Sequence, residues 1–407
     1  MLVTVRRAPR RTSALLAVVS ALALLFMTAC TAGSSTKSAD AAPTEEKLAP
    51  AKTSASVTTN VAMEPAAGST DVNPVTPVTL TAQDGILSDV VMTNEAGEPV
   101  EGTLSPDLLS WTSAEPLGYA KTYNVTANTT SVEGVVKPFE SQIQTLSPAN
   151  LTAVSTIPSK SGQTFGVGMP LIVKFDEPIN DKAKAEQFMT VTTSNGTVGA
   201  WYWFSDKEAH WRPKDYYQPG TVVTLDVKIF GQDLGGGLYG EEDRQVSFTI
   251  GDSMVSEVSD IDKQLRVYKN GSLVKTFPAS LGMDKYPSQS GVHVVQEKYE
   301  MKIMDSSTWG LPTDAPDGYY LEVPWATRIS MSGEFVHAAP WSVADQGVRN
   351  TSHGCIGISM ENGQWFYENA TYGDIVVIKD TTAQLKASDG WGDWNIPWDE
   401  WQAGGKK

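Results

Sequence analysis

The chain has 407 residues, of which 41% are hydrophobic and 19% are charged. This is the composition of a globular protein with room for about two to four domains. Asp and Glu outnumber Lys and Arg by 47 to 31, which gives a formal net charge of −16. Because no basic patch follows the first few residues, nucleic acid is not expected as a partner.

Residues 1–29 have the features of an export signal. Four arginines come first: Arg6, Arg7, Arg10 and Arg11. The apolar run Ser13–Met27 is then long enough for a signal peptide but short for a membrane span. It ends in Met27-Thr28-Ala29-Cys30, which resembles a bacterial lipoprotein box with Met27 in place of the usual Leu. We expect cleavage before Cys30, lipidation of Cys30, and anchoring to the outer face of the cytoplasmic membrane, within reach of the cell wall. The alternative is an ordinary signal peptide cut near Ala32.

The second of the two cysteines, Cys355, then has no disulfide partner. An unpaired thiol in an oxidising compartment is prone to damage unless it is used. Cys355 is therefore a candidate nucleophile before any motif is considered.

Residues 30–60 are rich in Ala, Ser, Thr and Pro and predict a disordered tether. Residues 61–251 are β-rich; Val223, Leu225, Val227 and Ile229, for example, alternate with polar residues.

Trp111 and Trp211 are 100 residues apart, and each precedes a similar run of Tyr, Pro and Gly and an alternating strand. This weak repeat predicts two immunoglobulin-like β-sandwich modules, at 61–147 and 148–251. We interpret His210 as a packed strand residue rather than a ligand.

Residues 252–379 form a further β-rich domain. Asn270-Gly271 between two apolar runs predicts a hairpin with a tight turn. Strands are also expected over three segments: Ser290–Val295, Ser332–His337 and Asp374–Lys379. The last of these is taken as the final strand, and Ser359–Asn369 as a short helix weakened by Gly363.

Residues 380–407 form a Trp-rich arm. Four tryptophans are crowded into it: Trp391, Trp394, Trp398 and Trp401. Each indole has a large apolar area, so the arm should fold back onto the body of the protein. Pro397 and the glycines nearby argue against one continuous helix.

The chemistry of the chain is concentrated around Cys355. His337 and His353 are near enough in sequence to lie beside its thiol, and a histidine can accept a thiol proton. Gly354 permits close approach of a substrate to the backbone. These residues indicate acyl transfer through a thioester. Three alternatives stay open at this point: a buried apolar cysteine, two structural histidines, and a zinc site, although no fourth zinc ligand is evident.

The order His337, Trp341, then Ser352-His353-Gly354-Cys355 resembles the signature of the YkuD-type L,D-transpeptidases. The resemblance extends through Met304–Gly310, Gly318-Tyr319, Trp325–Thr327 and Asn350–Cys355. The segment Gly392–Trp398 and two preceding immunoglobulin-like modules are similar to the actinobacterial lipoprotein branch.

This resemblance implies that Cys355 is the nucleophile and His337 its base, with the Ala338 carbonyl holding the tautomer of His337. Ser352, His353 and Gly354 would complete the catalytic motif, with His353 an orienting residue, and the N–H groups of Gly354 and Cys355 would be oxyanion donors. Five residues are implied in substrate binding: Met304, Tyr319, Trp341, Asn350 and Thr351. No metal or organic cofactor is implied.

The implied reaction is cross-linking of peptidoglycan stem peptides. Cys355 would displace D-Ala from a tetrapeptide stem, and the side-chain amine of a second stem would resolve the thioester into a 3→3 cross-link. Resolution by water would instead give an L,D-carboxypeptidase. Carbapenems are implied as covalent inhibitors.

The resemblance also implies a position for the Trp-rich arm. In relatives the arm lies at the seam between the second module and the catalytic domain, so we expect it there.

One position departs from the family pattern. Gly357 stands two residues after the nucleophile, where relatives have Asn or Arg. This departure is the sequence feature that favours a catalytically impaired wall-binding lipoprotein as another alternative.

Overall fold

The computed structural model describes residues 59–405. The proposed signal peptide, Cys30 and nearly all of the tether lie outside this range. Within it the protein is mainly β, as the sequence predicts. No helix of the described range has the length and apolar character needed to cross a bilayer.

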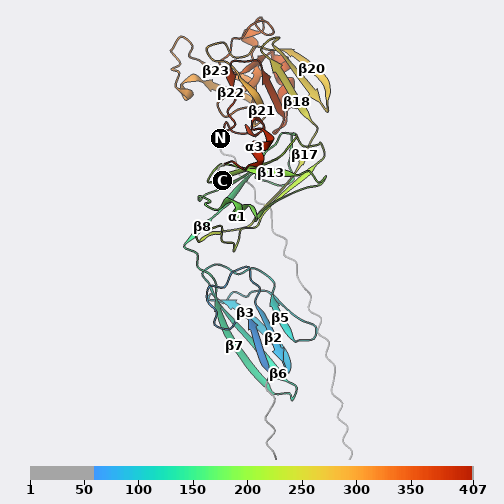
Figure 1. Ribbon diagram of the computed structural model, residues 1–407, viewed down its shortest axis with the longest axis vertical. Coiled ribbons are helices and arrows are strands. Elements are labelled where there is room, and N and C mark those ends of the chain that lie inside the picture. The colour runs from blue at the N-terminus through green and yellow to red at the C-terminus, as the bar shows by residue number, and fades with distance from the viewer. Residues whose placement is uncertain (1–58, 406–407) are drawn as a thin grey trace, which may run out of the picture. The chain divides into compact units, whose positions relative to one another are not determined.

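The first module is a sandwich of two antiparallel sheets (Figure 1). One sheet has the order β1(Asn60–Glu64), β2(Thr79–Gln83), β5(Ser110–Ser113) and β4(Gly102–Leu104). The other has the order β3(Gly85–Asn94), β6(Thr122–Ser131) and β7(Val136–Gln144). Side chains from both sheets, including Leu80, Met92, Trp111 and Val125, form one buried core.

The second module is also a sandwich. One sheet has the order β10(Thr164–Phe165), β17(Arg244–Ile250), β15(Val222–Val227) and β12(Met189–Thr193). The other has the order β13(Gly199–Ser205), β14(Glu208–Pro213), β11(Leu171–Phe175) and β9(Val154–Ile157). The short pair β8(Asn150–Thr152) and β16(Leu238–Gly240) and the helix α1(Lys182–Glu186) complete the module.

The two tryptophans that suggested duplication hold equivalent positions. Trp111 lies on β5 and Trp211 on β14, and both are almost fully buried. A glycine on the neighbouring antiparallel strand, Gly102 or Gly199, pairs with the residue two places after each tryptophan. A Cβ at either glycine would collide with the indole ring. The shared register supports a repeated module.

The third part of the chain holds two more sheets. One has the order β20(Ser272–Pro278), β19(Gln264–Lys269), β18(Met254–Ser259), β26(Ile375–Lys379), β21(Gln289–Val294) and β27(Ala383–Gln384). The other has the order β22(Glu297–Asp305), β23(Tyr320–Arg328), β24(Phe335–Ala338) and β25(Ile356–Ile358). The helix α2(Met360–Asn369) connects the second of these sheets to β26 of the first, while the short turns η1(Ser306–Trp309) and η2(Pro340–Ser342) connect strands within the second.

Local predictions in this part are confirmed with two corrections. The strand expected over Ser332–His337 begins only at Phe335, because residues 331–333 form a turn and bend ahead of β24. Asn270 and Gly271 have φ of 49° and 79°, the backbone of a primed hairpin turn. Ser359 caps α2, and Gly363 lets the helix approach β24, because a Cβ there would lie 2.6 Å from that of Ala338. The final strand is β27 rather than β26, since the chain returns to pair beside β21.

The Trp-rich arm packs between the second module and the β-rich domain of residues 252–379. Its only helical pieces among the described residues are the short 3-10 turn η3(Asp393–Asn395) and the five-residue helix α3(Trp398–Gln402), so it is not one continuous helix, as expected. Trp401 is fully buried and donates to the Ala200 carbonyl at 2.8 Å, while Trp394 donates to the Gly168 carbonyl at 2.8 Å. Asn395 donates to the carbonyl of Val292 at 2.8 Å. The arm therefore contacts both neighbours.

A buried cation explains why the arm is rich in tryptophan. Arg212 on β14 is 2% exposed, and its guanidinium carbon lies 4.3 Å from the ring of Trp401, 4.7 Å from Trp394 and 5.5 Å from Trp398. Aromatic faces attract such a cation, most strongly where water is excluded. The guanidinium also donates to the Ile396 carbonyl at 2.7 Å.

His210 is a packed strand residue, as interpreted, but it is also half of a buried ion pair. Its Nδ1 lies 3.0 Å from both carboxyl oxygens of Asp393, and its Nε2 lies 2.8 Å from Glu208. Burial opposes the charge on His210, yet Asp393 and Glu208 outweigh it and raise the pKa to about 9. The imidazolium thus fastens the arm to the second module.

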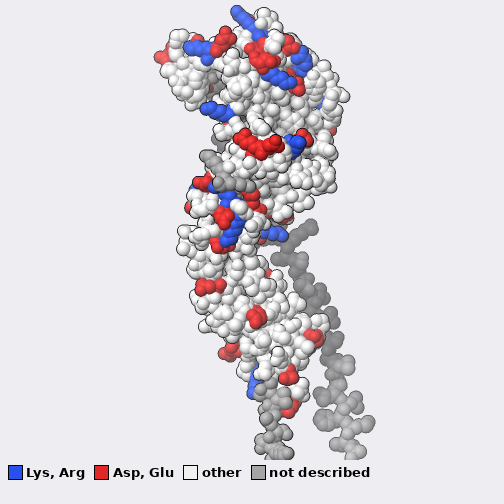
Figure 2. Space-filling model, in the orientation of Figure 1, with Lys and Arg blue, Asp and Glu red and all other residues white. Residues whose placement is uncertain are grey.

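Charges of both signs are scattered over the surface (Figure 2). On the face drawn in Figure 2, Lys and Arg side chains are scattered among Asp and Glu and form no continuous basic surface.

Replacing Asp393 by Asn should lower the free energy of unfolding by about 3 kcal/mol near pH 6, because it breaks a buried ion pair. The folded-state pKa of His210 is raised, so this stabilisation is complete below pH ~6.5 and is lost as pH rises through about 9. Thermal unfolding of both proteins across this pH range measures the effect. The exposed Asp399→Asn on the same arm is the control. A difference between wild type and Asp393→Asn that stays constant up to pH 10 would contradict the prediction.

Candidate active site

Parallel pairing of β24 and β25 brings His337 and Cys355 to one place. His337 lies on β24 opposite Gly357 of β25, and Cys355 directly precedes β25. The core residues Val336, Ile356 and Ile358 are fully buried and hold the two strands in register. The sheet therefore fixes imidazole and thiol on the same cavity.

Two cavities meet at Cys355. The smaller, of about 160 Å³, is lined by Ser280, Met304, Tyr319, Leu321, Val323, His337, Ala339, Trp341, Ser342, Thr351, Ser352, His353, Cys355 and Gly357. The larger, of about 600 Å³, shares four of these residues: Met304, Tyr319, His353 and Cys355. Gly333, Glu334 and Gly354 line only the larger cavity. The sulfur can thus be approached from two sides.

The hydrogen bond of His337 defines its tautomer. Its Nδ1 lies 2.8 Å from the Ala338 carbonyl, which can only accept, so Nδ1 carries the proton. Nε2 is then free to accept a proton in the neutral ring. Burial lowers the pKa of His337, although the Ala338 carbonyl acts in the opposite direction. The imidazole is therefore neutral at rest, with its basic nitrogen available.

Cys355 is half-buried, and its thiol donates to the Gly333 carbonyl at 3.7 Å. Burial is the main cause that raises the pKa of this thiol to about 12, and the nearby Glu334 adds to it. The thiol is protonated at neutral pH. Among residues 59–405, no group of His, Cys, Asp and Glu side chains is arranged to hold a metal ion, and this geometry disfavours the zinc alternative.

The hydroxyl of Ser352 organises the loop that carries the thiol. It donates to the Cys355 carbonyl at 2.6 Å and accepts from the Gly354 N–H at 3.2 Å. On the other side, Ser288 donates to the Gly354 carbonyl at 2.6 Å. The Gly354 N–H, expected as an oxyanion donor, is thus already engaged, and the Cys355 N–H stays the predicted donor.

Aromatic rings surround His353. Its ring stacks on Tyr286 with centroids 4.6 Å apart and lies 4.9 Å from Tyr319 and 6.4 Å from Trp309. Burial lowers the pKa of His353, so it too is neutral at rest. Such packing suits an orienting residue better than a second base.

Four of the five expected substrate residues line the smaller cavity. They are Met304 on β22, Tyr319 ahead of β23, Trp341 on η2 and Thr351. Trp341 is 54% exposed, and its ring lies over His337 with centroids 6.0 Å apart. These side chains form an aromatic and apolar rim around the thiol.

Asn350 is the exception. Its amide donates to Asp260 at 2.6 Å and accepts from the Leu281 N–H at 3.2 Å, and it does not line either cavity at Cys355. It holds the loop to the body of the domain instead. Both of its hydrogen-bonding partners come from distant segments, which the motif could not reveal.

Gly357 lines the smaller cavity through its backbone. It exchanges two hydrogen bonds with Ser280, of 2.8 Å and 2.9 Å. A Cβ at this position would lie 3.1 Å from that of Ala339. The glycine thus closes the floor of the cavity.

Three residues that support the loop were not among those predicted from the sequence: Tyr286, Ser288 and Glu334. Only Glu334 left a signal, as a carboxyl directly before the apolar strand residues Phe335 and Val336. A charge at such a point should be either exposed or functional, and it is 4% exposed.

Two protein-family models match the chain. Residues 69–233 match the bacterial Ig domain, and residues 255–378 match the L,D-transpeptidase catalytic domain.

Comparison with known proteins agrees. The chain is 46% identical to L,D-transpeptidase 2 of Mycobacterium tuberculosis, over 81% of each protein. It is 36% identical to L,D-transpeptidase 5 of the same species, over 83% of this chain and 75% of that protein. Among solved structures, LD transpeptidase LdtMt1 in complex with imipenem is 32% identical with a TM-score of 0.50, covering 57% of this chain and all of that one.

Proposed function

The chain belongs to the L,D-transpeptidase family, and we propose that it forms 3→3 cross-links in peptidoglycan through a thioester on Cys355. The observation that carries this proposal is that the thiol of Cys355 and the neutral imidazole of His337 line the same, smaller cavity, and that Nε2 of this imidazole is free to accept a proton. A thiol needs such a base to attack an amide carbonyl at neutral pH.

The first half-reaction consumes a tetrapeptide stem. Because both groups are neutral at rest, the thiol proton passes from Sγ to Nε2 of His337 as sulfur attacks. The new S–C bond forms at the carbonyl carbon of the third residue, and the Cys355 N–H supports the oxyanion. The C–N bond to the terminal D-Ala then breaks, and the amine leaves with the proton from Nε2. The stem stays on Cys355 as a thioester.

The second half-reaction needs an acceptor. The side-chain amine of the third residue of another stem attacks the thioester carbonyl, His337 takes its proton, and the C–S bond breaks. The released sulfur takes that proton back, which restores the resting pair. Two cavities that meet at one sulfur support a two-peptide reaction, because hydrolysis needs room for one peptide only.

Family membership indicates an extracytoplasmic enzyme that acts on the cell wall. We further propose that a lipid on Cys30 holds it to the outer face of the cytoplasmic membrane. The segment between Cys30 and β1 would then link the lipid to the first module. The apolar run that ends at Cys30 supports this proposal.

Cys355→Ala should abolish release of D-Ala, since it removes the nucleophile. His337→Ala should lower the rate by roughly 10²–10⁴-fold, the usual contribution of a general base. Mass spectrometry of a tetrapeptide muropeptide incubated with each protein measures both D-Ala and cross-linked dimer. Release of D-Ala with a tripeptide as the sole other product would identify a carboxypeptidase. Activity kept in His337→Ala but lost in His353→Ala would show that the base is wrongly assigned.

Carbapenems should acylate Cys355, because a strained lactam offers a carbonyl to the same thiol. Imipenem is the natural choice, since it is bound in the solved relative. Intact-mass and peptide analysis should place one adduct on the Cys355 peptide of the wild type. The same adduct on Cys355→Ala would place the reactive group elsewhere.

Wild type should partition with membranes, and Cys30→Ala should be released into the soluble fraction. A lipid with two or more acyl chains is enough for stable anchoring. Fractionation of cells expressing each form tests this. Identical partitioning of the two forms would mean that Cys30 carries no anchor.

A further inference from the structure

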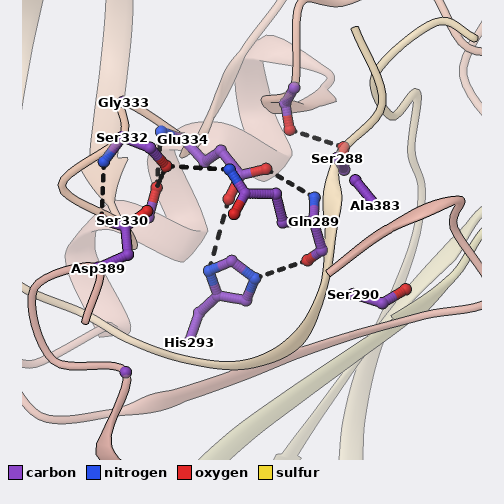
Figure 3. A network of polar contacts seen from close by, with 12 residues as sticks. Ser288, Gln289, Ser290, His293, Ser330, Ser332, Gly333, Glu334, Ala383 and Asp389 are labelled. Carbon is purple, nitrogen blue, oxygen red and sulfur yellow. Dashed lines mark hydrogen bonds and ion pairs between the residues drawn. The ribbon is translucent and has the colours of Figure 1, made fainter. Parts of the chain in front are cut away.

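A second buried acid–base pair lies behind the Cys355 loop. Glu334 precedes β24 and is 4% exposed, and His293 on β21 is fully buried. Figure 3 shows the two side chains pointing toward each other, with Oε2 of Glu334 3.6 Å from Nδ1 of His293. These two atoms have no hydrogen-bond partner within residues 59–405. The catalytic mechanism above uses neither residue.

The contacts of His293 locate the protons of this pair. Its Nε2 lies 2.8 Å from the Gln289 carbonyl, which only accepts, so Nε2 carries a proton. Nδ1 of a neutral ring is then a lone pair that faces Oε2 of Glu334. A carboxylate there would set lone pair against lone pair, whereas a carboxylic acid can donate. The arrangement therefore favours a protonated Glu334 facing a neutral His293.

The pair is joined to the nucleophile through two segments. The Gln289 N–H donates to Oε1 of Glu334 at 2.8 Å, so the pair clamps both polar groups of that backbone. The adjacent Ser288 donates to the Gly354 carbonyl. Gly333, which directly precedes Glu334 in the chain, accepts a hydrogen bond from the Cys355 thiol through its carbonyl. Glu334 thus supports the loop from both directions.

We propose that Glu334 and His293 are positioning residues that form an uncharged pair, hold the Cys355 loop, and keep its surroundings uncharged while the thiol gives up its proton. The inference rests on the proposed function in one respect, that this thiol is the nucleophile. An anion at Glu334 would repel the developing thiolate across a water-poor site.

The electrostatics of the surroundings agree. Burial is the main cause that raises the pKa of Glu334 to about 8, while burial lowers the pKa of His293. Asp389 from the arm accepts from the Ser332 N–H, and its charge acts to raise the pKa of both groups. Arg328 from β23 donates to the Ser330 carbonyl and is paired with Glu297 at 2.6 Å, so its charge is already balanced. The state of Glu334 therefore decides the local charge.

The test is the pH dependence of Cys355 alkylation by iodoacetamide in the detergent-solubilised full chain, followed on the Cys355 peptide by mass spectrometry. Glu334→Gln keeps an acceptor for Gln289 and a donor for His293 but cannot ionise. We expect its alkylation rate to match wild type near pH 6.5 and to exceed it roughly three- to tenfold at pH 9.5. Glu361→Gln, an exposed acid on α2, is the matched control and should follow wild type.

Glu334→Ala separates positioning from charge, because it is neutral but cannot bind Gln289. It should lower D-Ala release several-fold, and Glu334→Gln should restore it. Superimposable alkylation profiles for wild type and Glu334→Gln would overturn the proposal. A wild type that releases no D-Ala, yet shows the expected alkylation shift, would sink the proposed function and leave this pair standing.

Discussion

The site depends on the parallel pairing of β24 with β25. That register sets His337 opposite Gly357. Cys355 lies directly before the first residue of β25 and lines the same cavity as His337. The pairing is held by close approaches on both sides. Ser280 takes both polar backbone groups of Gly357, and α2 reaches Ala338 only because Gly363 has no side chain. A thiol and a base that line one cavity therefore follow from packing of the backbone.

Charge is distributed unevenly through the molecule. Around Cys355 the resting groups are neutral: burial raises the pKa of the thiol and of Glu334 and lowers that of His337. At the arm the opposite holds, and His210 and Arg212 stay charged in a buried setting because carboxylates and indole faces surround them. A neutral site lets charge develop only during reaction, where backbone N–H groups can stabilise it. At the seam between the arm and the second module, the charges of His210 and Arg212 are instead stabilised by carboxylates and indole rings that are present in the folded protein at all times.

The arm connects the reaction site to the module before it. Its indoles surround Arg212 of the second module, while Asn395 bonds to the backbone of β21. The strand β21 also carries His293, which supports the Cys355 loop through Gln289. A continuous path of hydrogen bonds and packed rings thus runs from the second module to the loop that holds the nucleophile, and this gives the Trp-rich segment a structural reason.

The sequence by itself determined the local features. The turn at Asn270-Gly271 needs positive φ, the start of α2 needs the Ser359 cap, and the closely spaced Ser352–Cys355 motif indicates its chemistry without long-range contacts. Only the tertiary structure decided which distant groups meet. It turned Asn350 away from the cavity, set Glu334 against His293, and joined His210 to Asp393 across 183 residues. Periodicity records which face of a strand is buried, but a buried polar group finds its partner only when separate strands and the arm pack together.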